Sequence, residues 1–309
     1  MGAPHLGDGE GAGAVKGTVI IPGFGPLRRA ALDQARKAES LLGEGFEALA
    51  PEGRNVAEAR NRGIDAARGA WIFWADADDE IGGPWARLVR RTAEEETAGV
   101  AVWGMETVTA RGRRRGAPAR DETVPAALAL RDCLSGRTGS YLHSAGSRAS
   151  LWRGLRFDPS LATMEDFILV PHLLARAAEV HRIPEAPYGY VQREGSLTRG
   201  DARAVARAVL PAAARREDEW RGTRFAADAS MGAADAVMTL WESLAAQGAR
   251  DEAREARSFL AERKRLLAAA GWGAKRRLRL LLALLGAGRA RGLISRTCAP
   301  FRGSTRVSS

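Results

Sequence analysis

The stretch Ala70-Trp71-Ile72-Phe73-Trp74-Ala75-Asp76-Ala77-Asp78-Asp79 joins an apolar run to an acidic cluster. The apolar part is too short for a free-standing helix and is bounded by charge, which is typical of a central strand buried on both faces. In an extended strand, side chains two residues apart point to the same side. We therefore expect Asp76 and Asp78 to converge, and Asp79 to turn away into the following loop.

Converging carboxylates need a cation or a proton between them. Two of them about 4 Å apart repel by roughly 4 kcal/mol at an effective dielectric constant of about 20. A hard ion such as Mg²⁺ or Mn²⁺ suits oxygen ligands and commonly bridges to a diphosphate. A solvated acidic turn explains the same spacing equally well, so the pattern alone leaves both interpretations open.

Strands and helices alternate on both sides of this stretch. A β-branched run from Gly17 to Pro22 predicts a buried strand, the periodicity of 27–42 predicts a helix, and 46–50 predicts a second strand. Asn55, followed three residues later by Glu58, is typical of a helix cap. A helix from Pro84, a strand over 100–108 and a basic hairpin tip over 111–115 follow. This alternation predicts an α/β fold with a mostly parallel sheet, whose ligands collect at the carboxyl ends of the strands.

Composition and charge divide the 309-residue chain into parts. Residues 1–16 are expected to be a flexible leader without a signal-peptide core, and the pattern changes near residue 200 to Ala- and Arg-rich helical periodicity over 201–270. Residues 271–309 hold nine Lys or Arg residues and no acidic residue, against a net charge of +10 for the chain. We expect this basic, leucine-rich tail to form an amphipathic helix on an anionic membrane, whereas a solvated tail is the plainer alternative. No segment is long and apolar enough to span a bilayer.

The order and spacing of several motifs resemble the family 2 glycosyltransferases of GT-A fold. They are Val19-Ile20-Ile21-Pro22, Asn55…Ala59-Arg60-Asn61-Arg62-Gly63…Arg68-Gly69 with the stretch quoted first, Phe157-Asp158, Met164-Glu165-Asp166-Phe167, and Tyr188-Gly189-Tyr190…Arg193-Glu194-Gly195-Ser196-Leu197-Thr198. The resemblance covers residues 17–200. It implies a Rossmann-like GT-A domain, with a mostly parallel sheet flanked by helices, followed by a C-terminal α-helical region.

The resemblance also assigns roles to individual residues. Asp76 and Asp78 match the metal-binding acidic motif, and Asp166 matches the general base. Arg60, Asn61 and Asp76 match positions in the donor pocket, and Pro22 and Glu52 are assigned to the same pocket. A carboxylate that takes the acceptor proton and a metal that neutralises the departing nucleoside diphosphate are coherent for an inverting sugar transfer.

Local interpretations compete with these roles. Thr163 and Asp166 can cap a helix over 164–178, and Arg60 and Arg62 can lie on a solvated helix face. The four histidines are scattered and suggest no metal site; His143 can face a pocket, although core or surface is the plainer interpretation.

The chain also departs from the family pattern. It passes from Glu52 almost directly to Asn55, so that about one helix and one strand of the nucleoside-binding region are missing. The opening Pro22-Gly23 is also unlike the family, which favours an aromatic residue followed by Asn.

The expected activity is a metal-dependent inverting hexosyl or related transfer. The sugar passes from a nucleotide-sugar donor, with a UDP-sugar favoured, to a glycan or lipid-linked acceptor of surface polysaccharide synthesis. Mg²⁺ or Mn²⁺ is the expected cofactor. The expected location is cytoplasmic, with peripheral contact to the inner face of the membrane and no nucleic-acid partner. A degenerate, non-catalytic binding or scaffold protein is the alternative, because of the shortened nucleoside region.

Overall fold

The computed structural model describes residues 14–161, 163–192, 201–268 and 272–285. Its main layer is a seven-stranded sheet with the strand order β3-β1-β5-β10-β6-β11-β9. In that order the strands are β3 (Phe46–Leu49), β1 (Gly17–Ile20), β5 (Trp71–Trp74), β10 (Ala145–Arg148), β6 (Val100–Val102), β11 (Glu179–Arg182) and β9 (Glu122–Pro125). All of these except β10 and β9 run in one direction, which confirms the mostly parallel α/β sheet.

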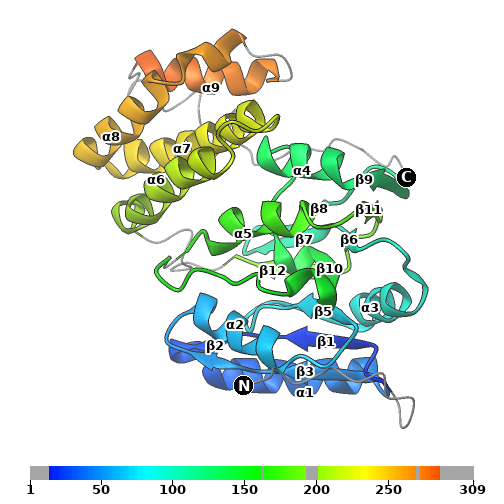
Figure 1. Ribbon diagram of the computed structural model, residues 1–309. Coiled ribbons are helices and arrows are strands. Elements are labelled where there is room, and N and C mark those ends of the chain that lie inside the picture. Colours follow the sequence, from blue (N-terminus) through cyan, green and yellow to red (C-terminus); the bar gives the residue numbers. More distant parts are fainter. Residues whose placement is uncertain (1–13, 162, 193–200, 269–271, 286–309) are drawn as a thin grey trace, which may run out of the picture.

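Helices cover the sheet and carry its connections (Figure 1). The predicted helix over 27–42 is α1 (Arg28–Leu42). In α2 (Val56–Ala66), the Asn55 side chain accepts a hydrogen bond from the Glu58 N–H at 2.9 Å, which confirms the cap. The other helices of this part are α3 (Gly83–Glu95), α4 (Ala126–Leu134) and α5 (Glu165–Leu174), with short 3-10 turns at Gly25–Leu27, Leu142–Ser144 and Ala149–Trp152.

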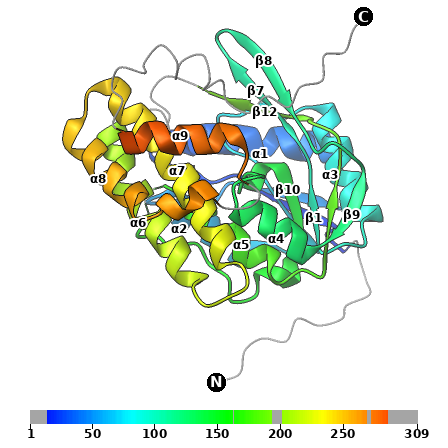
Figure 2. The same cartoon turned by 90° about the horizontal axis from the view of Figure 1, so that it is seen from above.

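The strand expected over 100–108 is two strands in different sheets. β6 ends at Val102, and β7 (Met105–Thr109) pairs with β8 (Gly112–Gly116) and β12 (Tyr188–Val191) in a three-stranded sheet. The chain leaves the large sheet because the Trp103 and Gly104 N–H groups donate to the Ser144 and Glu185 carbonyls instead. The expected hairpin is confirmed, but its tip is at Ala110 and Arg111, whereas 112–115 lie in β8. The hairpin projects from the body of the protein (Figure 2).

The C-terminal part is helical, as expected. It consists of α6 (Ala202–Glu219), α7 (Ala226–Gln247), α8 (Arg250–Ala261), a 3-10 turn (Lys264–Ala268) and α9 (Ala274–Leu285). These helices share a core that includes Val237, Trp241 and Leu260. Trp220, Phe225 and Ala229 belong to a second cluster, which they share with residues of β6, β9 and α4 in the sheet part. The boundary expected near residue 200 stays a prediction.

Within the described ranges, none of the helices has the length and apolar character that a membrane span requires. The predicted leader and the tail beyond Leu285 fall mostly outside the described residues.

Candidate active site

The acidic stretch is a turn rather than a continuation of the strand. β5 ends at Trp74, and the Asp79 N–H donates to the Asp76 carbonyl at 3.3 Å, which folds the chain back on itself. The Gln34 side chain of α1 holds the turn from below by donating to the Asp79 carbonyl at 2.8 Å. The expected convergence of Asp76 and Asp78 assumed that the strand continues through them. The strand ends before the acidic residues, so that assumption does not hold.

Asp79 points inward, so the expectation that it turns away into the loop is wrong. Its side chain is buried, with 8% exposed. One carboxylate oxygen accepts the Tyr188 hydroxyl at 2.6 Å and the other accepts the Val191 N–H at 2.8 Å. Tyr188 also accepts the Asp76 N–H at 2.9 Å, so a single hydroxyl from β12 ties both ends of the turn together.

Asp76, Asp79 and His143 form a group that could hold a metal ion. One ligand atom from each lies within 4.8 Å of the other two, and His143 Nδ1 is 3.6 Å from an Asp76 carboxylate oxygen. His143 is buried and stacks on Tyr188 and Tyr190 with ring centroids 4.7 and 5.4 Å apart. His143 is therefore a member of the candidate site and not an ordinary core or surface residue. Asp78 lies in the same turn, partly exposed and outside this group.

The two carboxylates of the group, of which Asp79 is buried and Asp76 half-buried, differ in proton affinity. Burial alone would raise the pKa of Asp76, but the neighbouring His143 and Arg60 lower it to about 2. Burial and the negative charge of Asp76 raise the pKa of Asp79 to about 7. A divalent cation between them would offset the burial and the repulsion that raise the pKa of Asp79, because an opposite charge favours the ionised form. The set of two carboxylates and one imidazole fits Mn²⁺ better than Mg²⁺, which prefers oxygen ligands.

Arg60 links the acidic turn to α5. Its buried guanidinium pairs with Glu165 and lies 3.4 Å from Asp76, and it stacks over the rings of Trp74 and Phe157. The solvated helix face considered for Arg60 is therefore wrong, whereas Arg62 is exposed and pairs with Glu58 within the helix.

Asn61 is engaged with the backbone of a neighbouring loop. Its amide nitrogen donates to the Phe157 carbonyl and its amide oxygen accepts the Phe157 N–H, both at 2.8 Å. Asn61 therefore fixes the loop that carries Phe157, the ring against which Arg60 packs.

Asp166 lies in the first turn of α5, a helix that begins without a side-chain cap. Met164 precedes the helix in the left-handed region with φ of 70°, unusual for a residue with a side chain, and no side chain caps the helix. The interpretation of Thr163 and Asp166 as a capping pair is thus wrong; Asp166 accepts the adjacent Phe167 N–H at 2.7 Å. Burial and the nearby Glu165 raise the pKa of Asp166 to about 7, which suits a general base working near neutral pH.

Pro22 and Glu52 lie beside the first strand. Pro22 is buried and precedes β2 (Gly23–Phe24), which pairs in parallel with β4 (Glu52–Gly53). This two-strand pairing lies at the short connection between Glu52 and Asn55. Glu52 is exposed, 3.5 Å from the Arg28 guanidinium.

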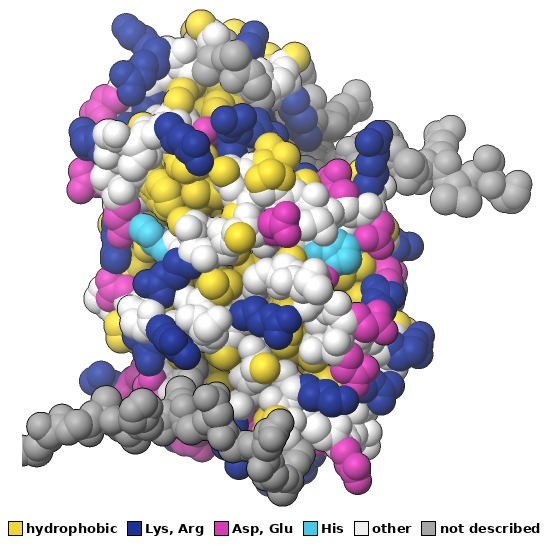
Figure 3. All heavy atoms as spheres, turned by 45° about the vertical axis from the view of Figure 1, so that its right-hand side comes forward, with side chains coloured by type: hydrophobic (Ala, Val, Ile, Leu, Met, Phe, Trp, Pro, Cys, Tyr) yellow, Lys and Arg dark blue, Asp and Glu magenta, His cyan; other side chains and the backbone are white. Residues whose placement is uncertain are grey.

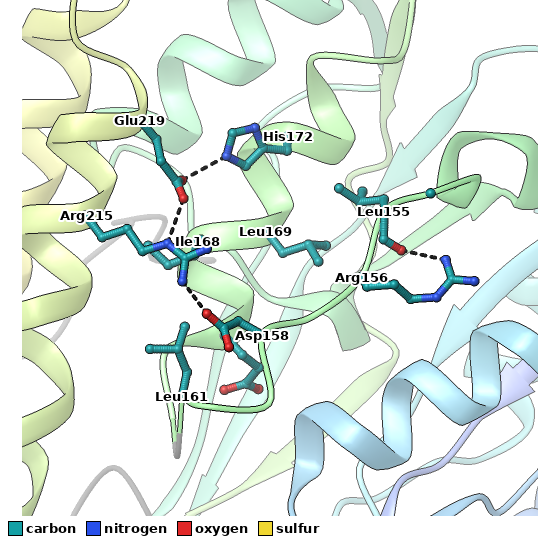
Figure 4. A pocket seen from close by; sticks show the side chains of 11 residues that line it. Leu155, Arg156, Asp158, Leu161, Ile168, Leu169, His172, Arg215 and Glu219 are labelled. Atoms are coloured by element: carbon teal, nitrogen blue, oxygen red, sulfur yellow. Dashed lines mark hydrogen bonds and ion pairs between the residues drawn. The ribbon is translucent and has the colours of Figure 1, made fainter.

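A cavity of about 210 Å³ lies on the far side of α5, against α6 (Figure 4). Arg215 spans it, pairing with Asp158 at 2.5 Å and with Glu219 at 2.7 Å, and His172 joins Glu219 at 2.9 Å. Glu165 lines this cavity while pairing with Arg60 on the other side. These ion pairs therefore tie α5, the helix that carries Asp166, to α6 of the C-terminal part.

Residues 29–146 match the family model described as Glycosyl transferase family 2. This part of the chain is a family 2 glycosyltransferase domain. The match contains Arg60, the acidic turn and His143, whereas Asp166 follows it in the chain.

Two known proteins resemble the chain over longer ranges. The succinoglycan biosynthesis protein ExoO of Rhizobium meliloti (strain 1021) is 33% identical over 155 residues, which are 47% of this chain and 44% of that protein. The chain thus aligns with less than half the length of this curated relative. The crystal structure of S. aureus TarS 1-349 in complex with UDP-GlcNAc has a TM-score of 0.56 at 15% identity and covers 91% of both chains. This likeness confirms the GT-A fold.

Sequence reasoning missed three members of the candidate site: Asp79, His143 and Tyr188. Asp79 was expected to point away because the side-chain alternation of a strand was applied to a segment that is a turn. His143 and Tyr188 reach the acidic turn from positions 67 and 112 residues beyond Asp76, so no local spacing indicates their contact. The signal for Tyr188 was its place in the Tyr-Gly-Tyr motif of the family resemblance.

Proposed function

We propose that this protein is an inverting transferase that moves a sugar from a nucleotide-sugar donor, with a UDP-sugar favoured, to a glycan or lipid-linked acceptor of polysaccharide synthesis. The observation that carries the proposal is the convergence of Asp76, Asp79 and His143 beside Arg60 and Asp166 within the family 2 domain and the segment that follows it. The relative ExoO is named for succinoglycan biosynthesis, and the TarS structure holds UDP-GlcNAc.

In this proposal the acidic turn and His143 hold a divalent cation. Asp76 and His143 would be ligands, with Asp79 or Asp78 as the second carboxylate, and Mn²⁺ fits this donor set better than Mg²⁺. Such an ion supplies positive charge that stabilises the departing diphosphate. Arg60 orients Asp76 and adds a second fixed positive charge, because its own position is set by Glu165 and two aromatic rings.

Asp166 acts as the general base in the same proposal. With a pKa of about 7 it is partly ionised at neutral pH and can take the proton of an acceptor hydroxyl as that oxygen attacks the sugar. Asn61 acts as a positioning residue that holds Phe157 under Arg60, rather than as a direct donor contact. Pro22 and Glu52 remain proposed contacts at the nucleoside end of the pocket.

Location and partners belong to the same proposal. We place the protein in the cytoplasm, in peripheral contact with the inner face of the membrane and without a nucleic-acid partner. A non-catalytic, glycosyltransferase-like binding protein is the competing function, and the two-residue pairing of β2 with β4 in place of a longer nucleoside segment favours it.

A donor-hydrolysis screen across nucleotide sugars, with and without Mn²⁺, tests the proposal. Wild type is compared with Asp78→Ala, Asp79→Asn and Asp166→Asn, and with Asp33→Asn on the exposed face of α1 as the matched control. We expect Mn²⁺-dependent turnover in wild type and control and a loss of at least a hundredfold in Asp166→Asn. Equal rates in all variants would refute the site, and absence of Mn²⁺-dependent UDP binding by calorimetry would favour the non-catalytic alternative.

A further inference from the structure

Helix α9 carries an exposed stripe of leucines. Leu278, Leu281 and Leu285 are 42%, 43% and 68% exposed. At spacings of three, four and seven residues they lie on one face of a helix and extend about 10 Å along its axis. The other large hydrophobic side chains exposed in the described chain are Leu32 on α1, Leu128 on α4 and Tyr141, just before the 3-10 turn Leu142–Ser144.

The opposite face of α9 is held to the protein. Leu280 and Ala283 are buried in the core of the C-terminal helices. Arg279 pairs with Glu242 at 2.7 Å and Asp235 at 3.1 Å, both on α7. The inward arginine is thereby neutralised, and the helix is fixed with its leucine stripe outward.

Positive charge lies beside the stripe. Lys275 and Arg277 are exposed and flank the leucines on either side of the helix face. Figure 3 shows hydrophobic side chains at the upper end of the protein, where α9 lies in Figure 1, with Lys and Arg side chains beside them. α9 contains no acidic residue, and the sequence beyond it adds five arginines and no acidic residue. The surface is therefore apolar at its centre and basic at its edges.

We propose that α9 docks the protein on an anionic lipid surface, with Leu278, Leu281 and Leu285 entering the region between headgroups and acyl chains. A helix with an apolar face and a basic border lies in the plane of such a surface, and each nearby Lys or Arg strengthens the attraction to anionic lipid. A second copy of the chain is the competing occupant of this face, and the oligomeric state measured below tests it. The docking surface rests on the membrane contact in the proposed function, for which it names the residues, and its test does not depend on sugar transfer.

Co-sedimentation with vesicles tests this docking surface. Full-length protein is mixed with phosphatidylcholine vesicles, or with vesicles in which about a third of the lipid is phosphatidylglycerol, at low and high salt. We expect binding to the anionic vesicles, weakened by salt because the charges are screened. The triple variant Leu278→Ser, Leu281→Ser, Leu285→Ser should lower the partition coefficient at least tenfold, and Lys275→Gln, Arg277→Gln several-fold at low salt.

Matched variants test whether the leucine stripe, and not another part of the protein, is responsible for vesicle binding. Leu32→Ser with Leu128→Ser changes leucines that are 42% and 40% exposed on α1 and α4, and should leave binding within twofold of wild type. Replacing the five arginines at 289, 291, 296, 302 and 306 by Gln tests the tail separately and should leave a leucine-dependent fraction of the binding.

Three results would overturn the proposal. The first is unchanged vesicle binding in the triple serine variant. The second is complete loss of binding in the tail variant with no effect of the leucines, since the tail would then be the membrane contact. The third is a dimer in light scattering that disappears in the triple variant, together with no vesicle binding by wild type, since the stripe would then join two copies.

Discussion

Replacing Asp166 by Asn should stabilise the protein while lowering its activity. The pKa of Asp166 is raised from 3.8 to about 7 by burial and by Glu165. Because the folded-state pKa lies above the unfolded-state value, ionised Asp166 destabilises the fold. This cost is fully present above about pH 7, shrinks as the pH falls through that value, and vanishes below about pH 4.

The magnitude follows from the same numbers. Each pKa unit corresponds to about 1.4 kcal/mol, so the rise sets a ceiling of about 4 kcal/mol at pH 8. Asp166 keeps partial contact with solvent, and we therefore expect Asp166→Asn to raise the free energy of unfolding by about 1–2 kcal/mol at pH 8 and by much less at pH 5. Urea denaturation at the two pH values measures this difference. The turnover number should fall by about 10²–10⁴, the range for a lost general base.

Asp33→Asn on the exposed face of α1 is the control, and we expect no pH-dependent gain from it. A variant at Asp166 that is destabilised, or equally stabilised at pH 5 and pH 8, would refute the raised pKa of this carboxylate. A stabilised variant with full activity would refute its role as base.

Three further predictions concern the turn, its neighbours and the reaction. Tyr188→Phe removes the hydroxyl that joins Asp76 and Asp79. We expect the free energy of unfolding in urea to fall by about 2–3 kcal/mol and kcat/KM to fall at least tenfold. A fully active, equally stable variant would contradict the role of this hydroxyl. Gly69→Ala places a Cβ 2.5 Å from the Thr18 backbone nitrogen. Thermal denaturation should therefore show a loss of more than about 2 kcal/mol in the free energy of unfolding. In the control Gly83→Ala only the tip of the Arg87 side chain is within reach of the new Cβ, and we expect unchanged stability. The kcat/KM of wild type should rise about tenfold per pH unit up to pH 7 and then level, because Asp166 must be ionised; a flat profile between pH 5.5 and 8 would contradict that requirement.

Local features of the sequence predicted the elements whose determinants are local. The cap of α2 depends on Asn55 and Glu58, three residues apart, and β5 follows from a short apolar run bounded by charge. The break between β6 and β7 depends instead on carbonyls of Ser144 and Glu185, which are distant in the sequence. Periodicity could not reveal it.

Only part of the candidate site could be predicted from the sequence. Asp76, Arg60 and Asp166 came from the family resemblance, and the structure brings them together around the Arg60 guanidinium. The orientation of Asp79 depends on where β5 stops and on a hydroxyl from β12, and the place of His143 depends on stacking with Tyr188 and Tyr190. These are tertiary contacts, so spacing in the acidic stretch gave no information about them.

Binding of Mn²⁺ in the presence of UDP, followed by the paramagnetic resonance signal of the free ion, tests the central claim most directly. The acidic turn together with His143 is claimed to hold the cation of a nucleotide-sugar donor. Asp76→Asn and His143→Phe should each weaken Mn²⁺ binding at least tenfold, while Asp33→Asn should leave it unchanged. Wild-type affinity in both site variants would contradict the claim.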